Sequence, residues 1–507
     1  MNIKQAKQEI TNTLKAYLAK DQLGNYLIPT VRQRPVLLMG PPGVGKTQIM
    51  EQIAAETGVG LVAYTITHHT RQSAIGLPFI EKRTYGGEEV SVTEYTMSEI
   101  LSSVYRLMER TGLQEGILFL DEINCVSETL APMMLQFLQC KTFGNQALPE
   151  GWLIVAAGNP PEYNKSVRDF DVVTLDRVKR IDVEEDYGVW KEYARRKNLH
   201  GAILSYLDIK KDNFYRIENT ADGLQFATAR GWEDLSELLY AYETLGIRAD
   251  REVVGQYIQM PRIAKDFANY LEMFYKYQKT YHVEGILSGT WENITVLELR
   301  EAPFDEKLSV MGLVLSRLSE EARNTRCQDA LTDALHTSLT EFREKIADAP
   351  PLTVLDQLLW KRRTAMKQAK EAGQLDKESR DLKQREINAL EDYRQRLDRE
   401  AVAPEGAMDA VRGWFGEEVE RRKAVAMETK DMFDNAFRFL ETTFGDSQEL
   451  VIFVTEITAG YDTSWFVEQF GCDAYFRHNR ELLFDSTRHR IREEITAAKA
   501  AEQEEHT

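Results

Sequence analysis

The 507-residue sequence has few cysteines, no long apolar run and no excess of basic residues, and each shortage excludes a class of protein. The four cysteines, Cys125, Cys140, Cys327 and Cys472, lie far apart and form no Cys-x-x-Cys pair. This spacing fits neither a disulfide framework nor a structural zinc site, so we interpret them as ordinary buried thiols. No stretch reaches the apolar length that crosses a bilayer, and residues 1–21 are typical of a polar amphipathic helix rather than a signal peptide. We therefore expect a cytoplasmic protein with no membrane contact.

The charge balance also restricts the partners of the chain. It has 63 basic and 81 acidic residues, which give a formal net charge of -18. Nucleic-acid binding needs a basic face that neutralises phosphates, so nucleic acid is an unlikely general partner, although a local basic patch or pore stays open. The composition, 43% hydrophobic and 28% charged, is that of a globular protein. Its length exceeds what one hydrophobic core usually supports, so we expect two or three domains.

The segment GPPGVGKT fits the Gly-x4-Gly-Lys-[Ser/Thr] pattern of a phosphate-binding loop. The apolar run 36–39 before it predicts a buried strand, and the segment after it predicts a helix that stops at Gly58. In this pattern backbone N–H groups face one anion, Lys46 reaches the β and γ phosphates, and Thr47 offers a hydroxyl to magnesium. An ordinary Gly/Pro turn is the alternative, which these regular flanks disfavour. The predicted nucleotide-binding residues are Gly40, Pro41, Pro42, Gly43, Val44, Gly45, Lys46 and Thr47.

A second segment, GILFLDEIN at residues 116–124, is an apolar run that ends in two carboxylates. Such a run is typical of a buried parallel strand. A magnesium-nucleotide site needs a carboxylate near the metal and a group that positions water. We predict that Asp121 binds magnesium, mostly through water, and that Glu122 polarises the attacking water, so that the site hydrolyses its nucleotide. The alternative is a strand that simply stops at a pair of solvated acids.

A third apolar strand is predicted over residues 152–157, and Asn159 follows it closely. Ligands of open parallel sheets bind beyond the carboxyl ends of the strands, so Asn159 should lie beside Glu122. Lys46, Asp121 and Asn159 should then converge on a common pocket. An amide at this place hydrogen-bonds the γ phosphate and the lytic water without adding charge. An Asn that only makes the Asn-Pro-Pro turn is the alternative.

Taken together, these motifs resemble the AAA+ ATPases, specifically the MoxR-like branch of the dynein-related subfamily. The segments that carry the resemblance are GPPGVGKT, LFLDEIN, AAGNPPEYN, TLDR and FATARGWEDLSELL, in this order over about residues 30 to 280. The resemblance implies an α/β P-loop NTPase fold with a parallel five-stranded sheet between helices, followed by a helical lid. It also implies a hexameric ring that binds ATP and Mg²⁺ at its subunit interfaces.

The resemblance further assigns roles to three polar residues. Asn159 corresponds to the sensor 1 residue, Arg177 to the arginine finger and Arg230 to the sensor 2 arginine of the lid. An arginine delivered to the neighbouring subunit's nucleotide neutralises charge on the transferred phosphoryl group, so hydrolysis depends on ring assembly. Arg230 would tie the position of the lid to the γ phosphate. For Arg177 two alternatives stay open, namely a surface ion pair with Asp176 and the use of Arg180 as the finger.

Between the first two motifs, residues 61–67 predict a strand and residues 79–92 predict a hairpin that turns at a Gly-Gly pair. By the resemblance, this hairpin belongs to an insertion in the second helix that projects toward the axis or face of the ring, where it could touch a substrate. The adjacent His68 and His69 are interpreted as polar strand-end residues rather than metal ligands, because no third ligand is near.

The remaining sequence reads as mainly helical, including residues 188–280. Apolar residues at seven-residue spacing, Leu375, Leu382 and Ala389, indicate either a helical hairpin arm or a solvated helix with one apolar stripe, and AVAPEG predicts a break before the final module. For ELVIFVTEI, the flanking patterns favour helix over strand. The expected domains are an N-terminal helix (1–30), an AAA+ core (31–187), a lid (188–280), a helical arm (281–400) and a mainly helical C-terminal module (401–507).

These features predict an ATPase that remodels or matures a protein client in a chaperone-like manner. By the resemblance, a von Willebrand factor type A domain protein is a candidate partner, because MoxR-like ATPases commonly work beside one. A nucleic-acid-dependent motor or restriction-type NTPase is an alternative that the acidic balance disfavours. A nucleotide-gated scaffold is another, which Glu122 and Asn159 disfavour. Cys472 and His478 lack a third group, so we interpret them as core residues rather than a reactive pair.

Overall fold

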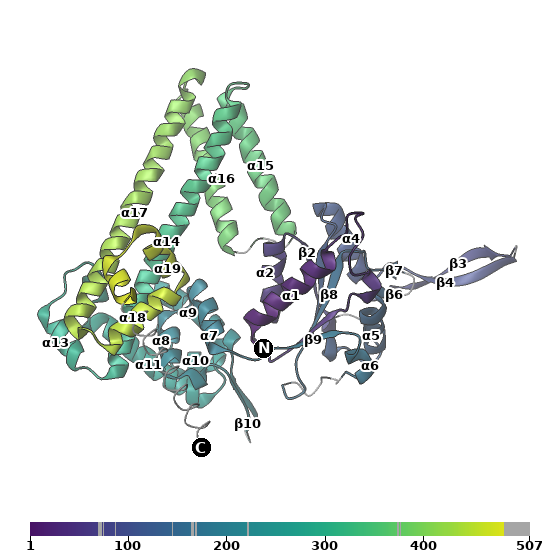
Figure 1. Ribbon diagram of the computed structural model, residues 1–507, viewed down its shortest axis with the longest axis horizontal. Coiled ribbons are helices and arrows are strands. Elements are labelled where there is room, and N and C mark those ends of the chain that lie inside the picture. Colours follow the sequence, from purple (N-terminus) through teal and green to yellow (C-terminus); the bar gives the residue numbers. More distant parts are fainter. Residues whose placement is uncertain are drawn as a thin grey trace, which may run out of the picture. The chain divides into compact units, whose positions relative to one another are not determined.

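The computed structural model describes residues 1–480, apart from residues 69–73, 75, 87, 144–145, 164–166, 168–169, 221–222, 373–374 and 376. The chain divides into two compact units (Figure 1). The first unit consists of Met1–Val189 and Leu352–Arg394. The second consists of Trp190–Pro351 and the chain from Gln395 onward.

The first unit is built on a parallel sheet of five strands. The strands are β1 (Val36–Met39), β2 (Gly60–Thr65), β5 (Gly116–Asp121), β8 (Trp152–Gly158) and β9 (Lys179–Asp182). Their order is β2-β5-β8-β1-β9, and each neighbouring pair is parallel. β1, β5 and β8 are buried along almost their whole length, which explains why their sequences are continuous apolar runs. The predicted α/β fold with a five-stranded parallel sheet is confirmed.

Helices cover both faces of this sheet. The covering helices are α1 (Ile3–Leu18), α2 (Lys46–Thr57), α4 (Glu99–Thr111) and α5 (Ala131–Cys140). Consecutive strand residues point to opposite faces, so Leu37 packs in the cluster under α4 and α5, whereas Val36 and Leu38 pack in the cluster under α1 and α2. α2 ends at Gly58, whose φ of 72° lies in the left-handed region that glycine adopts without strain, as the sequence predicts.

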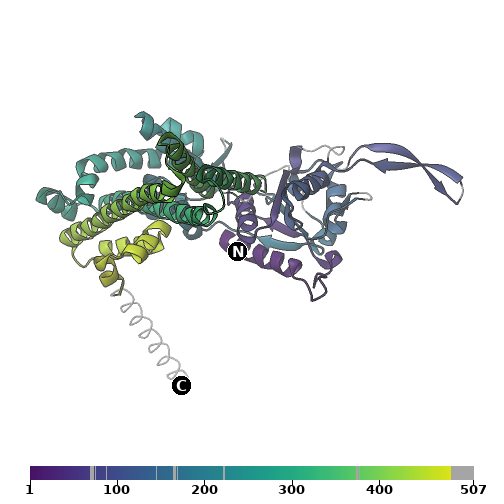
Figure 2. The ribbon, with the colours of Figure 1, turned by 90° about the horizontal axis from the view of Figure 1, so that it is seen from above.

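A hairpin projects from the first unit (Figures 1 and 2). Its strands are β3 (Pro78–Tyr85) and β4 (Glu88–Tyr95), which pair antiparallel, so the predicted hairpin is confirmed. Every residue of β3 is exposed. The strand predicted over 61–67 is shorter than expected, because β2 ends at Thr65 and a short 3-10 helix, Ile66–His68, follows. Residue Gly87 of the expected turn, His69 and the side chain of His68 lie outside the described residues.

Two further helices of the first unit, α15 (Pro351–Glu371) and α16 (Lys377–Arg399), run antiparallel. Ion pairs join them, with 3.0 Å between Arg362 Nε and Glu386 Oε1 and 2.8 Å between Arg394 Nε and Asp356 Oδ1. They form a helical hairpin, which is one of the two arrangements that the sequence allows. The seven-residue stripe does not make its buried face, because Leu375, Leu382 and Ala389 are only half-buried. The buried positions of α16 are Glu386, Ile387, Leu390, Tyr393 and Leu397.

The second unit is mainly helical. Its helices include α7 (Tyr187–Arg196), α8 (Gly201–Ile209), α9 (Ala229–Leu245), α10 (Arg251–Tyr257), α11 (Pro261–Thr280), α12 (Val283–Leu287), α13 (Asn293–Glu301), α14 (Phe304–Lys345), α17 (Ala407–Phe444), α18 (Gln448–Ala459) and α19 (Tyr461–Phe470). α18 confirms the helix predicted for ELVIFVTEI. The predicted break at AVAPEG is also confirmed, since α16 ends at Arg399 and α17 begins at Ala407.

The helical prediction for residues 188–280 is wrong at one place. β10 (Arg216–Thr220) and β11 (Gly223–Ala227) pair antiparallel there. The strands are five residues long and only half of their ten residues are exposed. β10 (RIENT) has a single large apolar residue, so it lacks the apolar alternation that marks a half-buried strand. The sequence does contain a hairpin signal here, an Asp-Gly pair whose glycine is the first residue of β11. Among the residues that the structure describes, none of the helices combines the length and the apolar character needed to span a membrane.

Candidate nucleotide-binding site

The loop between β1 and α2 has the backbone form of an anion cradle. Gly43 and Gly45 have φ values of 78° and 91°, which favour glycine over residues with a side chain. Gly45 is the N-cap of α2 and carries no side chain to cap it, so the positive end of the helix faces the loop. A Cβ on Gly40 would come within 2.9 Å of the Val183 carbonyl oxygen, so close packing against the chain after β9 requires glycine.

Lys46 is held inside this loop. Its side chain is 8% exposed, and its Nζ donates to the carbonyl oxygens of Gly40 and Pro41 at 2.8 Å and 2.9 Å. A further hydrogen bond of 2.8 Å joins Nζ to Oδ1 of Asn159, beyond the end of β8. The ammonium group has three donors, and these three acceptors converge on it. The predicted meeting of Lys46 and Asn159 is therefore observed in the geometry.

Two oxygen atoms that could bind a metal ion lie close together beside the start of α2. Thr47 Oγ1 donates to Oδ2 of Asp121, the last residue of β5, at 3.0 Å. Hydroxyl and carboxylate oxygens are hard ligands that suit Mg²⁺, so these residues fit the cation that the fold implies. Among the described residues, there is no group of three or more His, Cys, Asp or Glu side chains that could hold a metal ion by itself. This fits Mg²⁺, which usually keeps water and substrate oxygens in its coordination shell.

Glu122 occupies a strained backbone position next to Asp121. Its φ of 56° is in the left-handed region, which is uncommon for a residue other than glycine and is often found at functional sites. Its Oε2 accepts a hydrogen bond of 3.0 Å from Oγ1 of Thr67, just after β2. Sequence reasoning missed Thr67, because this contact depends on β2 lying next to β5 in the sheet.

Asn124 is a second residue that sequence reasoning missed. It is buried, and its Nδ2 donates to the backbone oxygen of Asn159 at 2.7 Å. A Cβ on Gly158 would lie 2.7 Å from Asn124 Oδ1, so the end of β8 is closely packed on this amide. Asn124 thereby fixes the backbone that presents Asn159. The signal in the sequence was a polar residue two positions after Glu122, inside an otherwise apolar segment.

The two candidate arginine fingers have different surroundings. Arg177 is exposed just after α6 (Val172–Leu175), and its Nη1 donates to Oε1 of Gln139 on α5. The observed partner is therefore an amide rather than Asp176, the partner in the alternative interpretation. Arg180 lies on β9, where its Nε bonds Oδ1 of Asp182 at 2.8 Å. The choice of Arg177 over Arg180 stays a prediction.

A comparison with protein families agrees with this geometry. Residues 35–178 match the family model described as AAA domain (dynein-related subfamily). The match supports an AAA+ ATPase. The AAA domain match includes the phosphate-binding loop, both carboxylates at the end of β5, Asn159 and Arg177. The comparison with curated proteins gives no match.

Arg230, the residue that the resemblance assigns to sensor 2, belongs to the second unit. It is exposed on the first turn of α9, a helix that is capped by Thr228 and anchored by the buried Trp232 and Leu235. Its role toward the nucleotide stays a prediction.

The cysteines differ from the expectation of four buried thiols. Cys472 is buried, Cys125 and Cys327 are half-buried, and Cys140 is exposed. Burial raises the pKa of the Cys472 thiol to about 12, so it is protonated near neutral pH and unsuited to nucleophilic attack. His478 instead pairs with Glu441, at 2.7 Å between Nε2 and Oε1. These contacts agree with the interpretation of Cys472 and His478 as core residues.

Proposed function

We propose that the protein is a cytoplasmic ring ATPase of the MoxR-like branch, which hydrolyses ATP with Mg²⁺ to remodel or mature a protein client. The observation that carries the proposal is the meeting of two strand ends with the phosphate-binding loop. Lys46 Nζ lies 2.8 Å from Asn159 Oδ1, and Thr47 Oγ1 lies 3.0 Å from Asp121 Oδ2. A phosphate-binding cation, a pair of metal-binding oxygens and a polar amide thus share one edge of the sheet.

Each side chain at this edge suits one part of ATP hydrolysis. Lys46 and the loop backbone bind the phosphates. Thr47 and Asp121 would hold Mg²⁺, which offsets negative charge on the phosphate oxygens when it is bound. Glu122 accepts a proton from the attacking water, and Asn159 orients that water relative to the γ phosphate.

Assembly into a ring would complete the site. Arg177 is exposed on the first unit, and Gln139 holds its guanidinium in place. We propose that Arg177 reaches the nucleotide of the neighbouring subunit, and that Arg230 links the lid to the γ phosphate. The hexamer itself is proposed from the resemblance to the MoxR-like branch.

The hairpin of β3 and β4 supports a protein client. It exposes large apolar side chains on two strands that form a separate two-stranded sheet, and apolar surface of this kind favours protein contacts. The exposed residues are Phe79, Ile80, Tyr85, Val90 and Tyr95. The net charge of -18 also supports a protein client over nucleic acid. By the resemblance, a von Willebrand factor type A domain protein is the proposed partner class.

The client proposal is tested by affinity capture with Glu122→Gln, a change expected to stall the ATP-bound ring. The combined variant with Ile80→Ser and Val90→Ser should lose captured clients, whereas a matched control with Thr84→Ser should keep them. Basal ATP hydrolysis measured in an otherwise unchanged chain should be the same with and without the hairpin substitutions. If single- or double-stranded DNA strongly raises the ATPase rate of the unaltered protein, the client assignment is wrong and a nucleic-acid motor takes its place.

A further inference from the structure

A cavity of about 380 Å³ lies within the second unit, among α7, α8, α14 and α18. This volume is in the range of small-molecule sites, which span about 300 to 1,000 Å³ and combine apolar walls with a few polar groups. The apolar wall is formed mainly by Leu204, Leu308, Met311, Leu315 and Ile452. The cavity belongs to a different unit from the phosphate-binding loop, so a ligand could bind there whether or not the protein hydrolyses ATP.

Glycines at two helix contacts define the walls of this cavity. A Cβ on Gly312 of α14 would lie 2.9 Å from Cβ of Ser205 on α8. A Cβ on Gly201 of α8 would lie 2.8 Å from Oγ of Ser316 on α14. The two helices therefore approach each other closely at two points, and all four of these residues line the cavity. The wall that α8 and α14 form is thus closely packed.

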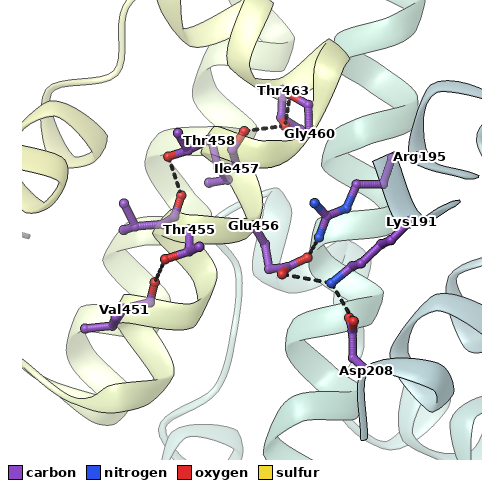
Figure 3. Close-up of polar contacts among 11 residues, drawn as sticks. Lys191, Arg195, Asp208, Val451, Thr455, Glu456, Ile457, Thr458, Gly460 and Thr463 are labelled. Carbon is purple, nitrogen blue, oxygen red and sulfur yellow. Dashed lines mark hydrogen bonds and ion pairs between the residues drawn. The ribbon is translucent and has the colours of Figure 1, made fainter. Parts of the chain in front are cut away.

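One end of the cavity is strongly polar (Figure 3). Lys191 Nζ on α7 lies 2.5 Å from Asp208 Oδ1 and 2.9 Å from Glu456 Oε1, and Arg195 also pairs with Glu456. The side chains of Lys191 and Arg195 are only 13% and 11% exposed. Two cations one helical turn apart repel each other, and their burial requires an anion between them. Burial lowers the pKa of Lys191 to about 8, and the Arg195 cation adds to this lowering.

Glu456 supplies that anion from a different part of the chain. It lies on α18 and its side chain is 21% exposed, more than either cation that it contacts. If its carboxylate turned toward water, the cavity would keep three lining cations, Lys191, Arg195 and Lys211, and the single carboxylate of Asp208. The site would then attract another anion. Glu456 thus occupies the position in which a ligand carboxylate would bind.

We infer that this cavity binds a small amphipathic carboxylate, whose head group replaces Glu456 between Lys191 and Arg195. The apolar body of the ligand lies against Met311 and Leu315 of α14 and Ile452 of α18. Binding breaks the ion pairs between α7 and α18, because one carboxylate takes the place of the other. Carboxylate binding therefore changes how α18 is attached to α7.

The test uses octanoate as the carboxylate and 1-octanol as its uncharged analogue, with the full chain in isothermal titration calorimetry. Octanoate should bind the unaltered protein more tightly than 1-octanol does. Glu456→Gln removes the competing carboxylate and should tighten octanoate binding by about tenfold, the worth of one charge-assisted hydrogen bond. Arg195→Met should weaken octanoate binding by at least about tenfold on the same grounds. The matched control Lys197→Met, on an exposed residue just after α7, should bind as the unaltered protein does.

Two results overturn the inference: octanoate binding that Arg195→Met leaves unchanged, and octanoate affinity that Glu456→Gln does not raise. Leu315→Trp provides a second route if Arg195→Met fails to fold, since it fills the cavity and leaves the ion pairs in place. Loss of octanoate binding in Leu315→Trp, with a circular dichroism spectrum like that of the unaltered protein, supports the site. Retained binding in that variant contradicts it.

Discussion

The ammonium group of Lys46 lies 2.8 Å from Oδ1 of Asn159, although 113 positions separate the two residues in the chain. Lys46 begins α2, and Asn159 follows β8, which pairs with β1 just before the phosphate-binding loop. The hydrogen bond joins the residue expected to bind phosphate to the residue expected to sense it. The side chain of Asn124 donates a hydrogen bond to the backbone oxygen of Asn159. Predictions about hydrolysis can therefore be made for residues to which the sequence motifs assign no role.

Asn124→Ala tests whether Asn124 positions Asn159. The change leaves the half-buried backbone oxygen of Asn159 without this donor, so the free energy of unfolding should fall by about 1 kcal/mol. kcat should fall more than ATP affinity, because the defect is in orientation rather than in binding. The measurement is a double-mutant cycle of kcat with Asn159→Ala. Non-additive effects support positioning, and fully additive effects show that Asn124 does not act through Asn159.

Mixed rings test the proposed trans role of Arg177. Arg177→Ala and Lys46→Ala should each be inactive alone, because each lacks a different half of an interface site. Rings that contain both variants should regain part of the ATPase activity. In such rings, the intact loop of an Arg177→Ala subunit can face the intact arginine of a neighbouring Lys46→Ala subunit. Arg180→Ala serves as the control and should stay active alone. If stable mixed rings show no recovery, or if Arg180→Ala is the inactive variant, Arg177 is not the finger.

Lys141→Met tests a pH-dependent contribution to stability. Lys141 is 8% exposed, its Nζ donates to the Thr30 carbonyl oxygen at 3.1 Å, and burial lowers its pKa from 10.5 to about 8. Between these two pKa values the unfolded state binds more protons than the folded state, so stability of the unaltered protein rises with pH. The Lys141→Met variant has no buried ammonium group at this position, so it lacks this pH dependence. The free energy of unfolding of the variant minus that of the unaltered protein should be greatest below pH 8. This difference should decline by up to about 3 kcal/mol as pH rises.

Urea unfolding at pH 7.5 and at pH 9.5 measures this difference. Lys367→Met, at an exposed position of α15, is the matched control and should show the same difference at both values. A pH-independent difference for Lys141→Met would mean that the Lys141 ammonium is not destabilised by burial.

The parts predictable from the sequence are those with local signals. β1, β5 and β8 are buried on both faces, so they appear as apolar runs, and their polar ends fall at one sheet edge because the strands are parallel. β9 carries the sequence KRID, which has no such run, and its place as a strand comes from pairing with β1. The contact of Thr67 with Glu122 likewise depends on strand order.

In the C-terminal region too, contacts between residues far apart in the sequence could not be predicted. The helix at ELVIFVTEI follows from its flanks, but the ion pair between Lys191 and Glu456 joins positions 265 apart. Neither residue has a motif around it. Only the packing of α7, α8 and α18 shows that two cations and two carboxylates share one end of a cavity.

The most direct test measures ATP binding and ATP hydrolysis by two variants, Glu122→Gln and Lys46→Ala. Glu122→Gln should bind ATP as the unaltered protein does and hydrolyse it at least about a hundredfold more slowly, the usual worth of a positioned base. Lys46→Ala should lose ATP binding itself, because the loop loses its phosphate-binding cation. Steady-state phosphate release and equilibrium ATP binding measure both effects. Unchanged turnover in Glu122→Gln, or unchanged ATP binding in Lys46→Ala, would contradict the account.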